Sequence, residues 1–214
     1  MKSIRHLLLI TSLCTLAPAC AGLALWGRLP ERVPTHFNFS GVADGWSGKP
    51  FAVFGLPLFL LTVHLICAFA VFHDPKAENV HGKIRTLCLW ICPAVSLFTA
   101  SMIYPNALGQ AVDVNLCAML LTGLLFVVVG NYLPKCRQNY TVGIKLPWTL
   151  ADEDNWNRTH RMAGPLWAAG GLLIIVDAFL QIQPLWVFCV IPLIAGIAPV
   201  IYSAALYLKK RGQA

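Results

Sequence analysis

Residues 51–72 read FAVFGLPLFLLTVHLICAFAVF, and this stretch decides the class of fold. Its 22 residues include no aspartate, glutamate, lysine or arginine. A helix needs roughly 20 mostly apolar residues to cross the hydrocarbon core of a bilayer. We therefore predict that this stretch forms a transmembrane helix.

Five similar stretches lie on either side of this one along the chain. Only 12% of the 214 residues are charged, whereas a soluble domain has about 25%. The stretches also lack the alternating polar pattern of barrel strands. We predict an all-α, polytopic membrane protein with about six transmembrane helices, in a single membrane domain over residues 1–214. The predicted spans are residues 7–27, 51–72, 86–104, 114–133, 163–180 and 185–208.

The basic residues are distributed unevenly between the two sides of these spans. Lysine and arginine favour the cytoplasmic side of a membrane protein. With the N-terminus inside, 13 of the 16 basic residues are cytoplasmic, and only Arg28, Arg32 and Lys49 lie outside. We predict that both termini are cytoplasmic. The net charge of +7 is then a signal of topology, and we predict no direct binding of nucleic acid.

The first span begins like a secretory signal, with Lys2 and Arg5 before an apolar run. This run continues through Trp26, which makes it longer than the apolar core of a signal peptide. We therefore predict that the first span is an uncleaved membrane anchor.

The loop over residues 28–50 is predicted to be extracytoplasmic and to fold into a small cap. Residues 35–39 alternate like a strand, and Ser40-Gly41 and Asp44-Gly45 are turn signals, so we expect a hairpin. Several apolar side chains are unusual for a solvated loop. They either pack on the helix ends, bind a ligand or lie in the interfacial aromatic belt. These residues are Phe37, Phe39, Val42 and Trp46.

The loop over residues 134–164 is predicted to be cytoplasmic, with a short helix over residues 150–162 lying on the membrane surface. Thr149 is the expected N-cap, and the acidic residues that follow it complement the helix dipole. Pro165 is expected to begin the fifth span, because a proline at the first helical position loses no hydrogen bond.

Both loops carry dense motifs. Those of the inner loop and its flank are Gly130-Asn131-Tyr132, Asn139-Tyr140, Val142-Gly143-Ile144, Pro147-Trp148-Thr149-Leu150, Trp156 and Thr159-His160. Those of the outer loop are Pro34, His36-Phe37-Asn38, Gly41, Asp44-Gly45-Trp46 and Lys49. In this order, and on opposite sides of the membrane, the motifs resemble the SdpI family of bacterial membrane proteins and the domain of unknown function that often precedes it. One departure is Lys145-Leu146, where the family pattern has arginine and a small polar residue.

The resemblance implies a multi-pass protein of a bacterial cell membrane that gives immunity to a secreted peptide toxin. It also implies a signalling role, in which the protein holds a transcriptional repressor at the membrane when toxin is present. It implies neither catalysis nor a cofactor. A transporter or exporter of a toxic peptide or lipophilic molecule is the alternative, although we find no matched halves in the sequence.

We predict one set of functional residues in each loop. The outer set either converges on a ligand or satisfies the backbone of its own loop; it comprises His36, Phe37, Asn38, Asp44 and Trp46. The inner set either forms a docking surface for a cytoplasmic partner or makes a tight turn with an interfacial tryptophan. It comprises Asn139, Tyr140, Gly143, Pro147, Trp148, Thr149, Trp156 and His160.

Other candidate sites are weaker. The eight cysteines lack the spacing of a zinc site, so we predict no metal. We also find no hydrolase, metalloprotease or P-loop motif. His64 and Asp177 are the ionisable residues inside the predicted spans. Their predicted depths differ by about 15 Å, so we expect no direct pair between them.

The charge distribution makes a testable prediction about orientation. A reporter fused after Lys210 should be cytoplasmic, and a reporter inserted at Gly41 should lie outside the cell, because basic residues stay inside. Paired fusions to a phosphatase and a fluorescent protein measure both positions. Reversal at either site contradicts the predicted topology.

Overall fold

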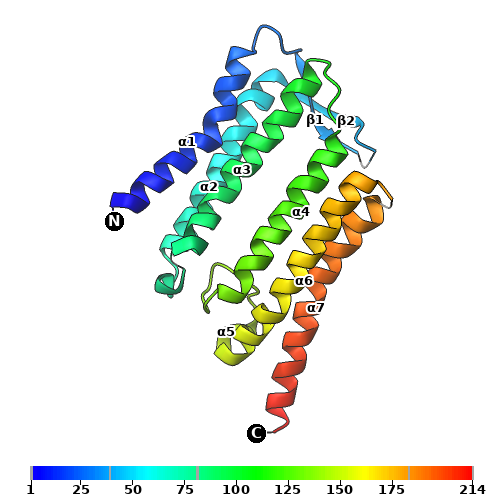
Figure 1. Ribbon diagram of the computed structural model, residues 1–214. Helices are drawn as coiled ribbons and strands as arrows, with labels where there is room; N and C mark the ends of the chain where they lie inside the picture. The colour runs from blue at the N-terminus through cyan, green and yellow to red at the C-terminus, as the bar shows by residue number, and fades with distance from the viewer. Residues whose placement is uncertain (1, 39, 81, 183, 214) are drawn as a thin grey trace. The chain divides into compact units, whose positions relative to one another are not determined.

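The computed structural model describes residues 2–38, 40–80, 82–182 and 184–213. Within these residues the chain forms mainly helices, together with one short β-hairpin (Figure 1). The α-helices are α1 (Lys2–Ala24), α2 (Leu56–Phe72), α3 (Gly82–Ala107), α4 (Val114–Tyr132), α5 (Pro147–Ala151), α6 (Glu153–Leu180) and α7 (Pro184–Arg211). The strands are β1 (Arg32–Phe37) and β2 (Ala43–Gly48), and a π-helical turn over Phe51–Gly55 leads into α2.

Six of these helices are long and apolar enough to cross a membrane. They overlap all six predicted spans, although α1 ends at Ala24, before the predicted end of the first span at residue 27. The prediction of an all-α, polytopic membrane protein is confirmed. The orientation of the two termini stays a prediction.

The chain divides into two compact units, which we describe separately. Unit 1 comprises Met1–Ala70 and Arg85–Cys117, and therefore holds α1, the hairpin and most of α2 and α3. Unit 2 comprises Val71–Ile84 and Ala118–Ala214, and holds the α2–α3 connection, most of α4, and α5 to α7.

The predicted hairpin is present in unit 1. Strands β1 and β2 pair antiparallel, with Arg32 opposite Gly48 and Phe37 opposite Ala43. The turn between them contains Gly41 at a φ of 73°, a left-handed conformation that glycine adopts without strain. Phe39, which we expected to belong to this element, lies outside the described residues.

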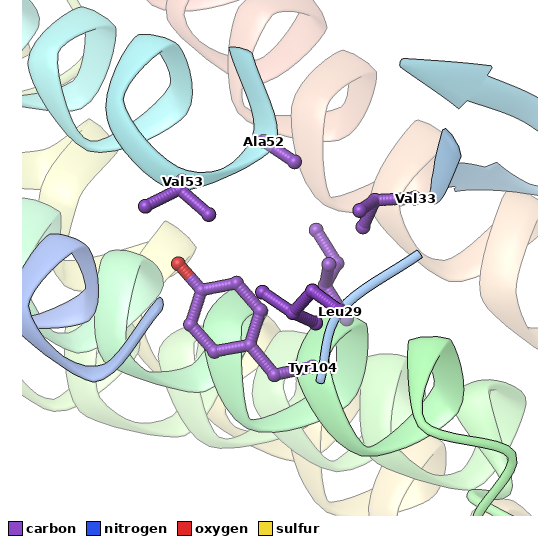
Figure 2. Close-up of a cluster of buried hydrophobic side chains, with 6 residues drawn as sticks. Leu29, Val33, Ala52, Val53 and Tyr104 are labelled. Atoms are coloured by element: carbon purple, nitrogen blue, oxygen red, sulfur yellow. The ribbon is translucent and has the colours of Figure 1, made fainter. Parts of the chain in front are cut away.

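A hydrophobic cluster in unit 1 includes Val33 of β1 and so connects the hairpin to the helices of that unit (Figure 2). Within it, the Tyr104 hydroxyl donates a hydrogen bond of 2.9 Å to the Pro18 carbonyl, which satisfies a buried polar group. A Cβ atom at Gly22 would lie 2.7 Å from that hydroxyl, so glycine permits this close approach of α1 and α3. The buried members of the cluster are Leu29, Val33, Ala52, Val53, Ile103 and Tyr104.

Small residues bring the helices of unit 2 together. A Cβ atom at Gly130 of α4 would lie 2.7 Å from the Gly164 carbonyl of α6, so the two backbones pack directly against each other. Helices α6 and α7 lie side by side (Figure 1), and the Trp167 indole of α6 donates a hydrogen bond of 2.8 Å to the Ala195 carbonyl of α7.

The predicted surface helix over residues 150–162 is wrong. Instead, α5 is a single turn over Pro147–Ala151, and α6 runs without interruption over Glu153–Leu180. Pro165 therefore lies inside α6 and does not begin a span. The reason is tertiary: the first turns of α6 are tied to α7, as described below, and Gly164 must stay helical to pack against α4. Membrane helices tolerate such an internal proline.

Thr149 is likewise not the N-cap that we predicted. The N-cap of α6 is Asp152, whose side chain accepts a hydrogen bond of 3.1 Å from the Asp154 backbone N–H. Thr149 lies within α5, and its hydroxyl oxygen accepts a hydrogen bond of 2.8 Å from the Leu146 backbone N–H. The threonine therefore stabilises the start of α5 from inside the helix.

Candidate functional site

The hairpin exposes four of its five predicted ligand residues. His36, Asn38, Asp44 and Trp46 are exposed, and the Trp46 side chain keeps 50% of its surface accessible. Phe37 differs from these, because it packs against the hydrophobic cluster of unit 1. The exposed surface thus combines one large aromatic ring with three polar side chains.

His36 and Asp44 lie next to each other on this surface. The imidazole Nδ1 of His36 is 2.5 Å from Oδ1 of Asp44, and the two side chains are 74% and 44% exposed. An exposed pair of this kind contributes little to stability. Its polar groups therefore remain accessible to a molecule that approaches from solution.

Asn38 serves the turn of the hairpin. Its Oδ1 atom accepts hydrogen bonds from the backbone N–H groups of Ser40, at 2.9 Å, and Val42, at 3.1 Å. An asparagine that bonds to the backbone in this way holds a turn in place. Of the two alternatives for the outer set, the contacts of Asn38 favour the one in which the side chain satisfies the backbone of its own loop.

Lys49 anchors the hairpin, and we did not include it among the site residues. Its Nζ atom forms an ion pair of 2.8 Å with Glu31 and lies 5.2 Å from the centre of the Trp26 ring. It also donates a hydrogen bond of 3.3 Å to the Trp26 carbonyl. A buried ammonium group requires such partners, so burial of this lysine holds the base of the hairpin in one position.

In unit 2, Asn139 organises the loop between α4 and α5. Its side chain is fully buried. The Oδ1 atom accepts hydrogen bonds from the backbone N–H groups of Thr141 and Val142, while Nδ2 donates to the carbonyls of Arg137 and Val142 at 2.8 and 2.9 Å. One side chain thus replaces the backbone pairing that this irregular segment lacks.

Trp156 and His160 hold the same loop against α6. The two rings stack with centroids 4.1 Å apart, as expected from their spacing of one turn. The Trp156 indole donates a hydrogen bond of 2.8 Å to the Cys136 carbonyl. In His160, Nδ1 must donate to the Trp156 carbonyl, so Nε2 is free to accept the 2.9 Å hydrogen bond from the Ile144 N–H. His160 is therefore neutral here, because a protonated ring has no acceptor.

Gly143 is required where these two rings meet the loop. Its φ is 119°, and a Cβ atom there would lie 2.5 Å from Nε2 of His160 and 3.0 Å from the Trp156 ring. A larger residue would displace the backbone that donates to His160.

A second polar network joins α5, α6 and α7. The Trp148 indole donates a hydrogen bond of 2.7 Å to the Ser203 hydroxyl, which in turn donates to Oδ1 of Asn155. Nδ2 of Asn155 then donates to the Ser203 carbonyl at 3.0 Å. Trp148 also stacks on Tyr207. These contacts fasten α5 to the two long helices.

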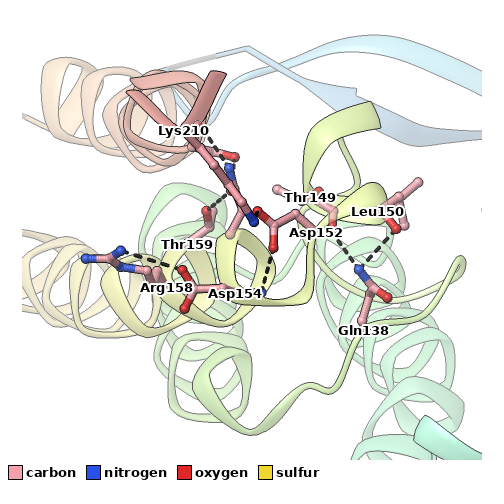
Figure 3. A network of polar contacts seen from close by, with 10 residues as sticks. Gln138, Thr149, Leu150, Asp152, Asp154, Arg158, Thr159 and Lys210 are labelled. Atoms are coloured by element: carbon pink, nitrogen blue, oxygen red, sulfur yellow. Dashed lines mark hydrogen bonds and ion pairs between the residues drawn. The ribbon is translucent and has the colours of Figure 1, made fainter. Parts of the chain in front are cut away.

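An ion pair also joins the start of α6 to the end of α7 (Figure 3). Nζ of Lys210 in α7 lies 2.8 Å from Oδ2 of Asp152. The hydrogen bond from Lys210 lowers the pKa of the Asp152 carboxyl below its ordinary value. The pair therefore contributes to stability above the carboxyl's unfolded pKa, and this contribution is lost as the pH falls through the folded value.

The predicted inner set is brought together, but mostly in the interior of unit 2. Asn139, Thr149, Trp156 and His160 are buried. Gly143 and Trp148 are half-buried, and Tyr140 and Pro147 are exposed. Within this set, Tyr140, Pro147 and the accessible parts of Gly143 and Trp148 reach the surface.

Besides Asp177, five buried polar residues in unit 2 were not among our predicted sites; Thr159 bonds to Asn155 within its own helix, and the other four have partners far away in the sequence. No local motif marks these four. A polar residue in an apolar helix, such as Ser203, is the one available signal. The four are Asp74, Gln138, Asn155 and Ser203.

His64 has a defined partner within unit 1. Its Nε2 atom is 3.1 Å from the Thr11 hydroxyl, and both side chains are fully buried. The Thr11 hydroxyl donates to the Leu7 carbonyl at 2.9 Å, so it accepts from His64. Asp177 belongs to unit 2, and its relation to His64 stays a prediction.

Comparisons with known proteins agree with the two motif regions. The model of the SdpI/YfhL protein family matches residues 135–203, and that of a domain of unknown function, DUF1648, matches residues 13–61. Immunity protein SdpI of Bacillus subtilis (strain 168) is 25% identical over 191 residues, which cover 89% of this chain and 90% of that protein. No solved structure matches. The predicted resemblance to the SdpI family is confirmed.

The role of Asn139 can be tested by truncation. Asn139→Ala removes the hydrogen bonds of a fully buried side chain and leaves backbone groups without partners, which should cost about 1–3 kcal/mol for each group left buried and unsatisfied. We expect faster protease cleavage within residues 136–146 and a lower melting temperature of the detergent-purified protein. Asn157→Ala, at an exposed position of α6, is the control and should match the wild type. Equal behaviour of the two variants would contradict the assignment.

Proposed function

We propose that this chain, with its SdpI/YfhL family region and its DUF1648 region, is a membrane immunity protein that protects a bacterial cell from a secreted peptide toxin. The observation that carries the proposal is the similarity to Immunity protein SdpI, which spans nine-tenths of both chains. Six membrane-spanning helices are consistent with this function, because a membrane-active peptide acts at the bilayer itself. On this proposal the chain resides in the bacterial cell membrane.

The hairpin is the proposed contact surface for the toxin. It lies in the loop that the charge distribution predicts to be outside the cell, where a secreted peptide arrives. Trp46 and the His36–Asp44 pair are exposed on it. Tryptophan is enriched in binding hot spots, since it combines a large apolar area with a polar N–H group. The buried Lys49 keeps this surface in one position, which lowers the entropic cost of binding.

Survival of sensitive cells tests the function. Bacillus subtilis lacking its own Immunity protein SdpI should die when exposed to the secreted peptide toxin, and expression of this chain should restore survival. The double variant Trp46→Ala with His36→Ala should lose at least ten-fold of this protection, because an interface hot spot contributes about 2 kcal/mol or more.

The control for this experiment is Thr62→Ala, in α2, where an exposed hydroxyl bonds only to its own helix. Immunoblotting must show equal amounts of all variants. If the wild-type chain does not protect, the proposed function is wrong. If the double variant protects fully, the hairpin is a structural cap and the toxin acts elsewhere.

We further propose that the loop over residues 136–150 recruits a transcriptional repressor when toxin is present. The accessible aromatic and apolar surface of this loop supports the proposal; it is formed by Tyr140, Pro147 and part of Trp148. The hydrogen bonds of Asn139, Trp156 and His160 hold the backbone of the loop in place. The surrounding exposed Arg137 and Lys145 would favour an acidic patch on the partner.

Co-purification tests the recruitment. Cells that express the tagged chain are treated with toxin, and cytoplasmic proteins bound to the chain are identified by mass spectrometry. Tyr140→Ala should reduce recovery of a repressor several-fold without changing membrane insertion, whereas Tyr140→Phe should retain it, because the ring is kept. Failure to recover a repressor with the wild-type chain removes the signalling role and leaves the immunity role standing.

A further inference from the structure

The connection between α2 and α3 belongs to a different unit from the helices that it joins. The body of α2, up to Ala70, and α3 from Arg85 onward belong to unit 1 together with the hairpin. The segment Val71–Ile84 belongs to unit 2 together with the loop over residues 136–150. The chain therefore passes from unit 1 to unit 2 after Ala70 and returns to unit 1 at Arg85.

Asp74 fastens the connection to that loop. Its side chain is 7% exposed. Oδ2 accepts hydrogen bonds from the backbone N–H of Tyr140, at 2.9 Å, and from the Thr141 hydroxyl, at 2.6 Å. Oδ1 accepts a hydrogen bond of 2.7 Å from the backbone N–H of Lys76. Hydrogen bonds to an ionised carboxylate are about twice as strong as neutral ones, so this is a firm attachment.

Gln138 extends the attachment to α5. Its side-chain oxygen accepts a hydrogen bond from Nζ of Lys76, and its backbone carbonyl accepts one of 2.8 Å from Asn79. Its Nε2 atom donates to the carbonyls of Thr149, at 2.8 Å, and Leu150, at 3.1 Å (Figure 3). A continuous set of hydrogen bonds therefore runs from the α2–α3 connection to α5.

We propose that Asp74 is a positioning residue that couples displacement of α2 and α3 to the loop over residues 136–150. Any movement of these two helices along their axes must carry Val71–Ile84 with it, because the chain is covalently continuous. Asp74 accepts hydrogen bonds from the main chain of Tyr140 and from the side chain of Thr141, so the loop must follow or these hydrogen bonds must break. This inference rests on the proposed function, since it describes how toxin outside the cell alters the inner loop.

The geometry favours Asp74 over its neighbours for this role. Hydrogen bonds weaken steeply when the distance or angle changes, so a small shift of the carboxylate has a large effect on both of its Oδ2 contacts. Tyr140 is the exposed aromatic residue of the loop, and its backbone N–H is one of those contacts. Nζ of Lys76 also lies 5.9 Å from the centre of the Tyr140 ring. Displacement of the connection therefore moves the proposed docking residue directly.

Hydrogen–deuterium exchange of the full-length protein in lipid nanodiscs tests the coupling. The probe is the same secreted peptide toxin as in the survival experiment, added to wild type and to Asp74→Asn. The asparagine keeps the size of the side chain but has one acceptor oxygen fewer, so its amide group faces either the Lys76 N–H or the Tyr140 N–H together with the Thr141 hydroxyl. Without toxin, we expect the Tyr140 amide of the variant to exchange roughly tenfold faster or more.

With toxin, two regions are compared. In the wild type, toxin should slow exchange in the hairpin, residues 32–48, and change exchange in residues 136–150. In Asp74→Asn, the hairpin should still respond, and the response of residues 136–150 should be lost. Asp154→Asn, which removes the same charge from an exposed ion pair in unit 2, should respond in both regions. Thr141→Val, which removes one of the contacts to Asp74, should give an intermediate loss if Asp74→Asn does not fold.

The outcomes separate this inference from the proposed function. A protected hairpin with no change in residues 136–150 of the wild type overturns the coupling and leaves immunity intact. A normal response of both regions in Asp74→Asn also overturns it, because the carboxylate is then dispensable. An unprotected hairpin, together with a failed survival test, overturns the proposed function and with it the coupling.

Discussion

Lipid offers no hydrogen-bond partners, so polar groups within the hydrocarbon core must be satisfied by the protein itself. Polar groups that are buried in the connecting loops also need partners within the protein. The long helices meet this requirement through their own backbones. Where the chain leaves helical structure, side chains take over. Asn139 forms four hydrogen bonds with the backbone of the loop before α5, and Lys49 has its partners at the base of the hairpin. The positions of the inner loop and of the hairpin depend on these hydrogen bonds and on the Lys49–Glu31 ion pair.

The same constraint gives the two predicted functional regions different characters. The hairpin satisfies its buried groups with few residues, which leaves Trp46 and the His36–Asp44 pair exposed. The loop over residues 136–150 uses most of its distinctive residues internally. Trp156 and His160 form its support. Most residues of the inner motif, which we predicted to form a binding surface, are therefore buried or half-buried and support the loop. Tyr140 is the aromatic residue of this motif that is exposed.

The loop over residues 136–150 is held together by its own hydrogen bonds, so it can be displaced as one body. Because Asp74 and Gln138 connect it to the α2–α3 segment, its position depends on more than its own sequence. The Ser203–Asn155 network fastens α5 to α6 and α7 on the other side. Signalling across a membrane requires contacts that differ between two states. Asp74 lies where such a difference would be transmitted.

Four features could be predicted from the sequence: the membrane class, the number of spans, the hairpin and the resemblance to the SdpI family. These follow from composition, from helix length in a bilayer and from dense local motifs, which are properties of contiguous residues. Orientation is also predicted from the sequence, through the distribution of basic residues.

The course of α6 and the burial of the inner motif depend on contacts between distant parts of the chain. Locally, Pro165 and Thr149 favour a short helix followed by a new span, but contacts with α4 and α7 keep α6 continuous. Asp74 meets Tyr140 across 66 positions of sequence, and Asn155 meets Ser203 across 48. Such pairs leave no periodic or local pattern, because the hydrogen bonds that require them form only when distant helices have packed.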